Sequence, residues 1–418
     1  MSVRADRPAA ASATGPNGRF AQHHVASREN AFTRGRDGLL RIVAYHPVMA
    51  GGTAGQNPGE ALLSPNVLDL KNHIEFAQTA EEIGIEYLFM AEGYDPGGPL
   101  VRAASVFDPW LYNPIIAAML IPATKRIGLV TTMHFSYFAP IVIARLGANL
   151  DAMSGGRWGI NMVTGPSNAP GLVPEPMRSL SHDARYDYAT EAMDVILKLW
   201  RGEHVDYHGK YIELKGQLID PLPVQQPPGI VSAGHSGAGR SFAAKFADYL
   251  FTTGGTKEQH DLEHEGLTDL LASYGRSPSD LKYQVRATTY VRDTQAEVDE
   301  FVERMESYFD PKVHESMVLQ YGGEHQGKLK EMEQKQLDKM NAEARRRSAT
   351  GMDFNLQGTP QHVADKIIDF YRQGRVQGIA LVFQDWHPTE LRQFGDKVMP
   401  LLKEEGIWVH PRERGYSW

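Results

Sequence analysis

One pattern recurs eight times along the chain: a short run of apolar and β-branched residues, a polar turn, and an amphipathic helix such as "NVLDLKNHIEFAQTAEEIG". The eight runs end at His46, Glu92, Thr132, Val163, Gly234, Thr253, Val291 and Phe383. Strands that alternate with helices form a parallel sheet. The count of eight favours closure over an open, doubly wound sheet, so we predict an α/β fold, a (β/α)8 TIM barrel.

Two stretches interrupt the pattern and predict insertions after strands 4 and 7. Residues 204–228 read as a small β excursion with a Pro-rich return, and residues 312–352 as a charged segment whose acids and bases interleave. The second is interpreted as a solvated insertion helix, with a nucleic-acid contact as the alternative. Because an insertion after strand 7 lies at the mouth of a barrel, a substrate lid also fits this segment. We expect a flexible arm over 1–36, the barrel domain over 37–410 and a tail over 411–418.

The charge balance argues against large polyanionic partners. Lys and Arg number 43 against 51 Asp and Glu, for a formal net charge of −8. A chain of this charge has no overall attraction to nucleic acid or to an anionic membrane surface. No apolar run approaches the ~20 residues of a membrane span. The absence of cysteine excludes disulfides and thiolate chemistry and fits a cytoplasmic protein.

Polar residues gather where the predicted strands end. In a barrel, catalytic and binding groups occupy the carboxyl ends of the strands and the loops that follow. Each such residue can be functional or can cap a strand, but together they favour a site. The residues so placed are His46, Glu92, Thr132, His134, Asn161, Thr164, His235, Ser236, Thr252, Thr253, Gln384 and Asp385.

The turn "AGHSGAG" lies between a predicted strand and a predicted helix. Its glycines let the backbone approach an anion, and the first amides of the helix and the Ser236 hydroxyl can donate to it. A phosphate site and an ordinary barrel connection both fit this turn. No metal site is predicted, because "AYHPVM" offers His46 without the second histidine of a His-x-His pair.

Four segments resemble the bacterial-luciferase-like flavin monooxygenases. They are "LDAMSGGRWGINMVTG", "SHDARYDYATEAMDVILKLW", "SAGHSGAGRSFAAKFADYLFT" and "QGTPQHVADKIIDFY", in the order found in that family. The chain is most similar to the branch of pyrimidine, nitrilotriacetate, and dibenzothiophene- or dimethyl-sulfone monooxygenases. The resemblance implies a barrel that uses reduced FMN (FMNH2) from a separate NAD(P)H:flavin reductase, with O2 as co-substrate. It also implies a homodimer or homotetramer.

The resemblance further implies which residues bind the flavin. Ser236 and the Gly237 amide correspond to the phosphate-binding turn, and His182, Arg185 and Tyr186 of "HDARYD" to the phosphate and ribityl region. For Arg185, an ion pair with Asp183 or Asp187 fits equally well. Positions along the isoalloxazine ring correspond to Thr132 and Asn161. Glu92 is a further flavin-binding candidate, at the position after the second strand where some relatives have Asp.

Proton handling is assigned to histidines, because imidazole titrates near neutrality. His134 ranks first and His46 next, with His235 as a further candidate, and Asp385 of "VFQDWHP" matches an Asp of the pyrimidine-type enzymes. Walls of the substrate pocket are drawn from aromatic residues that can equally belong to the core: Trp110, Tyr112, Phe135, Tyr137, Phe138 and Trp386.

The expected function is an FMNH2- and O2-dependent monooxygenase acting on a small organic molecule, with C–S, C–N or amide-type bond cleavage. The alternatives are a deazaflavin-dependent reductase or dehydrogenase of the same superfamily, a non-catalytic flavin-binding barrel, and a phosphate-binding barrel isomerase. The loop "PSNAPGLVPEP" departs from the pyrimidine-type enzymes, and the segment "GYDPGGPLVRAASVFDPW" is closer to the sulfone- and chelate-oxidising relatives. Because "VFQDWHP" keeps an Asp of the pyrimidine-type enzymes, these signals conflict and the sequence leaves the substrate open.

Overall fold

The computed structural model describes residues 38–51, 57–94, 98–165, 177–252, 261–262, 264–314, 316, 354–374 and 376–414. The predicted arm, most of the 312–352 insertion and Thr253 lie outside these residues. The strands are β1 (Arg41–Tyr45), β2 (Tyr87–Met90), β3 (Gly128–His134), β4 (Trp158–Val163), β5 (Val205–His208), β6 (Glu213–Gln217), β7 (Gly229–Ser232), β8 (Tyr249–Thr252), β9 (Lys282–Val291), β10 (Phe354–Gly358) and β11 (Gly378–Phe383).

Eight of these strands close a parallel barrel, in the order β9, β11, β1, β2, β3, β4, β7, β8 and back to β9. Each of the eight predicted runs supplies one of them, so the predicted TIM barrel is confirmed. Apolar residues on both faces of each strand explain the agreement, because the strands are covered by helices outside and by each other inside. No helix among the described residues has both the length and the apolar character needed to cross a bilayer.

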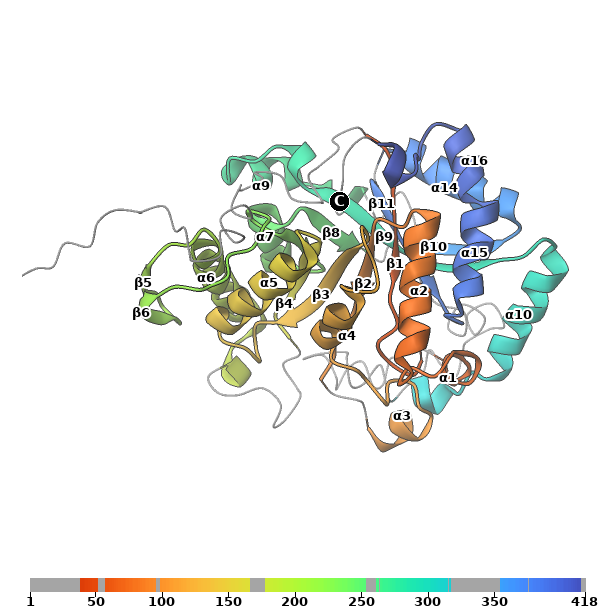
Figure 1. The fold of residues 1–418 in the computed structure, drawn as a ribbon, viewed down its shortest axis with the longest axis horizontal. Helices are drawn as coiled ribbons and strands as arrows, with labels where there is room; N and C mark the ends of the chain where they lie inside the picture. Colours follow the sequence, from red (N-terminus) through yellow and green to blue (C-terminus); the bar gives the residue numbers. More distant parts are fainter. Residues whose placement is uncertain are drawn as a thin grey trace, which may run out of the picture.

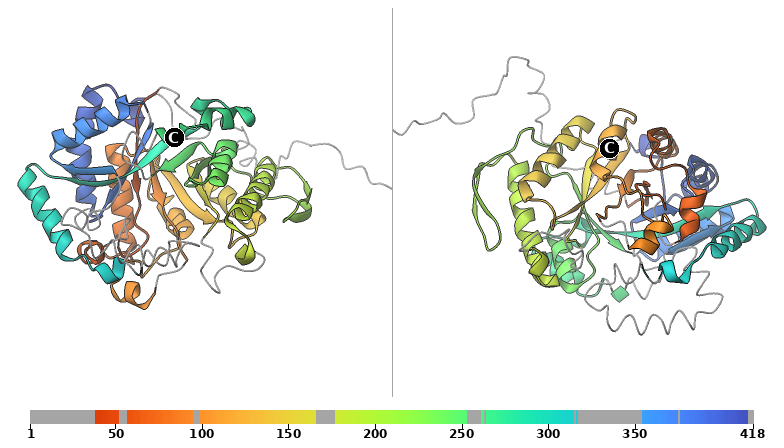
Figure 2. Two further views of the ribbon diagram at one scale, coloured as in Figure 1. Left: turned by 180° about the vertical axis from the view of Figure 1, so that it is seen from behind. Right: turned by 90° about the horizontal axis from the view of Figure 1, so that it is seen from below.

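Helices surround the barrel (Figure 1). They are α1 (Pro58–Leu63), α2 (Leu70–Ile83), α3 (Pro99–Ala103), α4 (Asn113–Leu120), α5 (Pro140–Ser154), α6 (His182–Trp200), α7 (Gly237–Phe246), α9 (Leu267–Ser273), α10 (Gln295–Ser307), α14 (Pro360–Arg372), α15 (Pro388–Lys397) and α16 (Met399–Glu404). Strands β5 and β6 form an antiparallel hairpin between α6 and β7. This hairpin and α10 lie on opposite sides of the molecule in every view (Figure 2).

The tenth strand was not expected from the sequence. The first residues of β9, from Lys282 to Val285, pair with β8, whereas Ala287–Val291 pair with β10. The other edge of β9 pairs with β11 from Gln284 to Thr289. Strand β9 is therefore shared between the barrel and a short extension beyond it, which α10 and α14 contact.

Alternation along the strands separates two cores. Inward-facing residues form an inner cluster: Val43, Tyr45, Tyr87, Phe89, Val130, Val231, Tyr249, Phe251, Ala380 and Val382. Their neighbours in sequence face outward and pack against the helices, as Ile42, Leu88, Leu129, Leu250 and Leu381 do. The inner cluster fills the barrel, so a ligand can enter only at its two ends.

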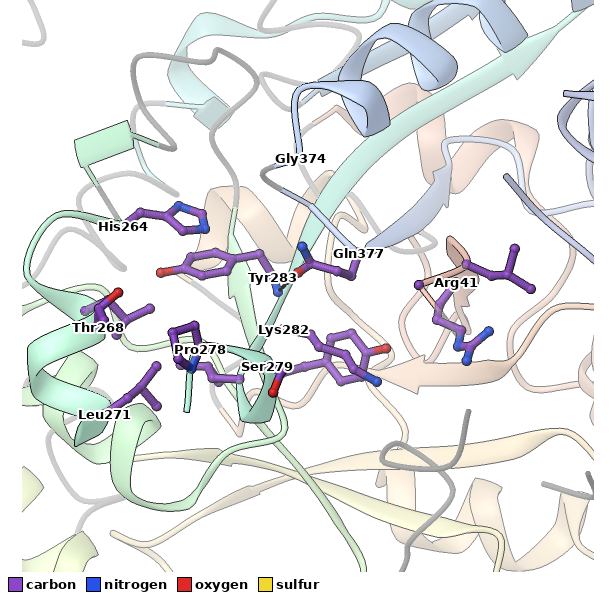
Figure 3. A pocket seen from close by; sticks show the side chains of 15 residues that line it. Arg41, His264, Thr268, Leu271, Pro278, Ser279, Lys282, Tyr283, Gly374 and Gln377 are labelled. Carbon is purple, nitrogen blue, oxygen red and sulfur yellow. Dashed lines mark hydrogen bonds between the residues drawn. The ribbon is translucent and has the colours of Figure 1, made fainter. Parts of the chain in front are cut away.

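The amino-terminal end of the barrel has a cavity of about 560 Å³ (Figure 3). Its walls include the stacked rings of His264 and Tyr283, with centroids 3.8 Å apart, Gln377 beside Tyr283, and Arg41 on the other side. Arg414, after α16, forms a buried ion pair with Glu86 at this same end. This cavity lies opposite to the carboxyl ends of the strands and is separate from the candidate site.

Candidate active site

The glycine-rich turn joins β7 to α7. Ser236 is the N-cap residue of α7, and its Oγ accepts a hydrogen bond from the Gly239 amide at 3.1 Å. Gly237 is exposed, and a Cβ added there would meet no atom within 4 Å. The space beside Gly237, at the amino terminus of α7, is therefore open, and the positive end of the helix dipole favours an anion there.

Two glycines of this turn are required by close packing. A Cβ on Gly239 would lie 2.8 Å from the Cα of Gly234 and 2.9 Å from the Tyr186 hydroxyl oxygen. Tyr186 comes from the second turn of α6, and the Thr164 hydroxyl also hydrogen-bonds to it. The structure thus brings "HDARYD" and "AGHSGAG" together through the Tyr186 side chain.

His182 and Arg185, the other two candidate residues of "HDARYD", differ in exposure. The His182 ring is half-exposed, with Nδ1 3.0 Å from an Asp183 carboxylate oxygen and its centroid 5.3 Å from that of Tyr186. Arg185 is buried and donates from Nη1 to the Leu180 carbonyl at 3.2 Å. Asp183 pairs with His182 and Asp187 lies 3.9 Å from Lys210, so neither supplies the alternative ion pair with Arg185.

Thr132 and Asn161 face inward from neighbouring strands. They are paired in the β3–β4 register, and the Asn161 amide donates from Nδ2 to the Thr132 hydroxyl at 3.0 Å. Asn161 is 4% exposed, and its Oδ1 has no hydrogen-bond partner in the described part of the chain. A buried polar atom without a partner costs free energy, so Oδ1 is suited to a donor on a ligand.

His134 ends β3 on the same inward face. Its Nε2 lies 2.9 Å from the Glu92 carbonyl, which can only accept, so Nε2 carries the proton. Burial lowers the pKa of His134 to about 4. The ring is therefore neutral at physiological pH, and its Nδ1, which has no partner among the described residues, is a hydrogen-bond acceptor.

The Glu92 side chain binds the amino-terminal end of α4. Its carboxylate accepts a hydrogen bond from the Asn113 amide at 3.1 Å, at the first residue of that helix. Burial raises the pKa of Glu92 to about 8, against two amide hydrogen bonds that lower it. At neutral pH the side chain is mostly protonated, which disfavours its use as a fixed negative charge.

Asn113 itself was missed by the sequence analysis. It is fully buried, and its Nδ2 donates to the carbonyls of Met90 and Thr132, so it ties the ends of β2 and β3 together. The signal was available in the segment "YNPII", because Asn-Pro often begins a helix. That motif alone gives no indication that the amide reaches two strand ends.

His46 lies away from the mouth of the barrel. It follows Tyr45, which faces inward, so its own ring faces the helices. Its Nε2 lies 3.0 Å from Nδ1 of His73 on α2, and its ring packs on Phe76. Burial, then the neighbouring His73, lowers its pKa. The expectation that His46 handles protons at the site therefore finds no support in this geometry.

Asp385 lies in the loop between β11 and α15. Its carboxylate accepts a hydrogen bond from the His387 amide at 3.2 Å, and burial raises its pKa. His387 is the N-cap residue of α15, and Glu390 in the first turn pairs with Arg292 at 2.7 Å. Asp385 thus organises the start of a helix, and it shares no hydrogen bond with His134 or Asn161.

Aromatic residues from the loops after β2 and β3 surround His134. Tyr94 lies 5.4 Å from the His134 ring and 4.6 Å from Tyr137, and Phe138 lies 5.9 Å from Tyr94. Tyr94 was not among the residues named from the sequence. Phe135 and Trp386 instead belong to the core between barrel and helices.

The family emerges from comparison with known proteins. A sequence model described as "Luciferase-like monooxygenase" matches residues 44–377. The chain belongs to this family. Among luciferase-like relatives, it is 26% identical to the dibenzothiophene-sulfone monooxygenase of Rhodococcus erythropolis over 402 residues, covering 82% of this chain and 88% of that protein. It is 25% identical to nitrilotriacetate monooxygenase component A of Aminobacter aminovorans, covering 81% and 87%.

Solved structures confirm the luciferase-like fold. The EDTA monooxygenase of Chelativorans sp. BNC1 superposes with a TM-score of 0.74 at 25% identity, covering 91% of this chain and 96% of that one. A riboflavin lyase solved with modified FMN and riboflavin superposes with a TM-score of 0.77 at 21% identity, covering 89% and 93%. Both the predicted resemblance and the predicted fold are therefore confirmed.

Proposed function

We propose that this luciferase-like monooxygenase is the oxygenase of a two-component system. It takes reduced FMN from a separate NAD(P)H:flavin reductase and uses O2 to oxidise a small organic molecule. The observation that carries the proposal is the open amino-terminal end of α7 at Gly237, with Tyr186 packed against the same turn. The name "component A" of one relative supports a separate reductase partner.

The residues present fit FMN. A dianionic phosphate matches the α7 amino terminus, the Ser236 hydroxyl and the Gly237 amide, with His182 and Tyr186 beside it. Asn161 Oδ1 and His134 Nδ1 are buried acceptors without partners among the described residues. An isoalloxazine ring carries N–H donors that suit such acceptors. Within the described chain no three His, Asp or Glu side chains gather closely enough to hold a metal ion.

When bound, reduced FMN would supply the two electrons that activate O2, and O2 would be the source of the oxygen atom that is transferred. The chain supplies binding, orientation and exclusion of water. Ser236 and Gly237 hold the phosphate, Thr132 and Asn161 orient the ring, and Tyr94, Tyr137 and Phe138 exclude water beside it. His134 Nδ1 accepts a proton or hydrogen bond at the mouth, because its Nε2 is held by the Glu92 carbonyl.

The test supplies the purified protein with NADH, a flavin reductase, FMN and ¹⁸O2. Candidate substrates are a sulfone, an aminopolycarboxylate and a thioether acid, which represent C–S and C–N bonds. The expected result is one ¹⁸O atom in the product of at least one substrate, dependent on the reductase. A parallel anaerobic titration compares reduced FMN with a reduced deazaflavin. Tighter binding of the deazaflavin and no ¹⁸O incorporation would contradict the proposal.

A further inference from the structure

The inward-facing residues of β9 differ from those of the other seven strands. Outward-facing Tyr283, Val285 and Ala287 belong to the outer core, so Gln284, Arg286 and Thr288 face the barrel interior. Arg286 lies opposite Ala380 in the β9–β11 register, and Ala380 is part of the inner cluster. A guanidinium group is thus placed inside the barrel.

The level of Arg286 along the barrel follows from its ring contact. Its guanidinium carbon lies 5.7 Å from the centroid of Tyr45. The Tyr45 ring packs on Phe89 and Phe251, with centroids 4.9 and 5.7 Å away, and these two rings stack at 5.2 Å. Three aromatic rings therefore form a layer across the barrel at this level.

Access to Arg286 comes from the mouth. Toward the amino-terminal end, the aromatic layer is followed by the buried side chains of Tyr87, Tyr249 and Gln284. Arg286 is nevertheless partly exposed, unlike the fully buried residues on either side of it in β9. Because the amino-terminal side is closed, the accessible surface of Arg286 faces the carboxyl ends of the strands, where Thr132 and Asn161 lie.

Arg286 is the charged residue among the described inward-facing strand residues in this half of the barrel. Above the aromatic layer, the other described inward-facing strand residues of the barrel are Thr132, His134, Asn161, Val163, Thr288 and its register partner Val382. None of these carries a charge, because burial keeps the His134 ring neutral by lowering its pKa. Thr288 is fully buried, and its hydroxyl has no hydrogen-bond partner among the described residues. The guanidinium group of Arg286 and the hydroxyl of Thr288 thus face the same space at the mouth of the barrel, both from β9.

A partly buried cation favours an anionic ligand over a neutral one of the same shape. The ring system of FMN offers this contrast: oxidised isoalloxazine is neutral, whereas the reduced ring releases a proton from N1 and carries negative charge along its N1–C2=O edge. Charge near N1 is one of the means by which a protein sets the properties of a bound flavin.

We propose that Arg286 binds the anionic N1–C2=O edge of reduced FMN, with the Thr288 hydroxyl beside it, so that the site prefers the reduced over the oxidised cofactor. This inference rests on the proposed function. It gives the barrel interior a role in cofactor selection: the protein takes up the flavin that a reductase has just reduced and releases it once oxidised. The phosphate is the same in both redox states, so the turn at Ser236 is not expected to distinguish them, whereas the charge of Arg286 complements the reduced ring.

The experiment measures the dissociation constants of oxidised and reduced FMN, the latter anaerobically, for the wild type, Arg286→Met, Arg286→Lys and a control. The control, Lys282→Met, removes a cation from the same strand at the opposite end of the barrel. We expect the preference for reduced FMN to fall about tenfold or more in Arg286→Met, to persist in Arg286→Lys, and to be unchanged in Lys282→Met. An unchanged ratio in Arg286→Met overturns the inference.

A spectroscopic measurement on the wild type does not depend on the folding of any variant. Neutral and anionic reduced flavin differ in absorbance, so the ionisation of N1 can be read directly. We expect bound reduced FMN to be anionic at a pH where free reduced FMN is still neutral. A neutral bound ring at that pH overturns the inference but leaves the proposed function standing, whereas failure to bind FMN in either state overturns both.

Discussion

The Ser236 hydroxyl accepts the Gly239 amide hydrogen at 3.1 Å, so the residue that we propose to bind phosphate also begins helix α7. A loss of FMN binding on substitution could therefore reflect a frayed helix or a lost phosphate contact. Separating the two requires side chains that retain one property at a time, and Ser236 allows such a series.

Ser236→Ala removes both the cap and the donor. We expect it to lower stability by about 1 kcal/mol and FMN binding by about 1–2 kcal/mol. Ser236→Asp preserves the cap, because Asp is as good an N-cap residue as Ser, but places a carboxylate against the phosphate. It should melt close to the wild type and bind FMN more weakly than Ser236→Ala. Calorimetric titration measures FMN binding and thermal unfolding measures stability. Equal FMN affinity in all three proteins would show that the phosphate does not bind at Ser236.

The glycines of the same turn should respond differently to a methyl group. Gly239→Ala pushes Cβ against Gly234 and Tyr186 and should destabilise the protein by roughly 1–3 kcal/mol. Gly237→Ala meets open space and should change the free energy of unfolding by no more than about 0.5 kcal/mol. Urea denaturation of the two variants provides the comparison. Equal destabilisation would show that the turn is not packed as described.

Glu92 should make stability fall as pH rises. The folded protein keeps this proton up to a pKa of about 8, whereas the unfolded chain releases it near 4.5. Between these values the folded state binds more protons, so lowering the pH favours folding and raising it opposes folding. Glu92→Gln keeps an uncharged side chain throughout and should flatten this part of the pH–stability curve. An unchanged slope in the variant would mean that other groups cause it.

His134 should contribute no titration to turnover between pH 5 and 8, because its pKa is held at about 4. Asn places an oxygen near the position of Nδ1, whereas Gln places its amide near Nε2. If Nδ1 is the functional atom, we expect His134→Asn to retain more activity than His134→Gln, which should lose about tenfold or more at each pH. Steady-state rates across this range, with a reductase supplying FMNH2, provide the measurement. The reverse order would assign the function to Nε2.

His46→Gln should lower stability without changing FMN binding. This change disturbs the contact with His73 inside the helix layer and should lower stability by about 1–3 kcal/mol. FMN affinity should remain at the wild-type value, because the side chain faces away from the barrel interior. Thermal unfolding and flavin titration on one preparation test both statements. A large loss of FMN binding in a well-folded His46→Gln protein would return this histidine to the site.

The barrel could be predicted because its strands are apolar runs bounded by turns, a signal that depends on each segment alone. The tenth strand, "FNLQG", was missed because Asn355 and Gln357 alternate with apolar residues over only five positions. Its existence depends on the free edge of β9 beyond Val285, which is a property of the folded sheet. Local pattern cannot reveal a strand that forms by joining such an edge.

The site was predictable as a set of strand ends but not residue by residue. Whether a side chain points into the barrel depends on the alternation along its strand, so a shift of one position reverses the result. Tyr45 faces inward, whereas the next residue, His46, faces outward. Arg286 and Thr288 were missed for the related reason that the run "YQVRATTYV" does not state which face is interior. Predicting the contact between Glu92 and α4 likewise requires knowing where that helix begins.

Strand β9 has a consequence for how the chain can change over generations. Its carboxyl-terminal half pairs with β10, and α10, which follows β9 along the chain, contacts β10 as well. The stretch between these two contacting elements can lengthen, shorten or be replaced while the eight barrel strands keep their register. The sequence between α10 and β10 can therefore diversify without a new barrel being required.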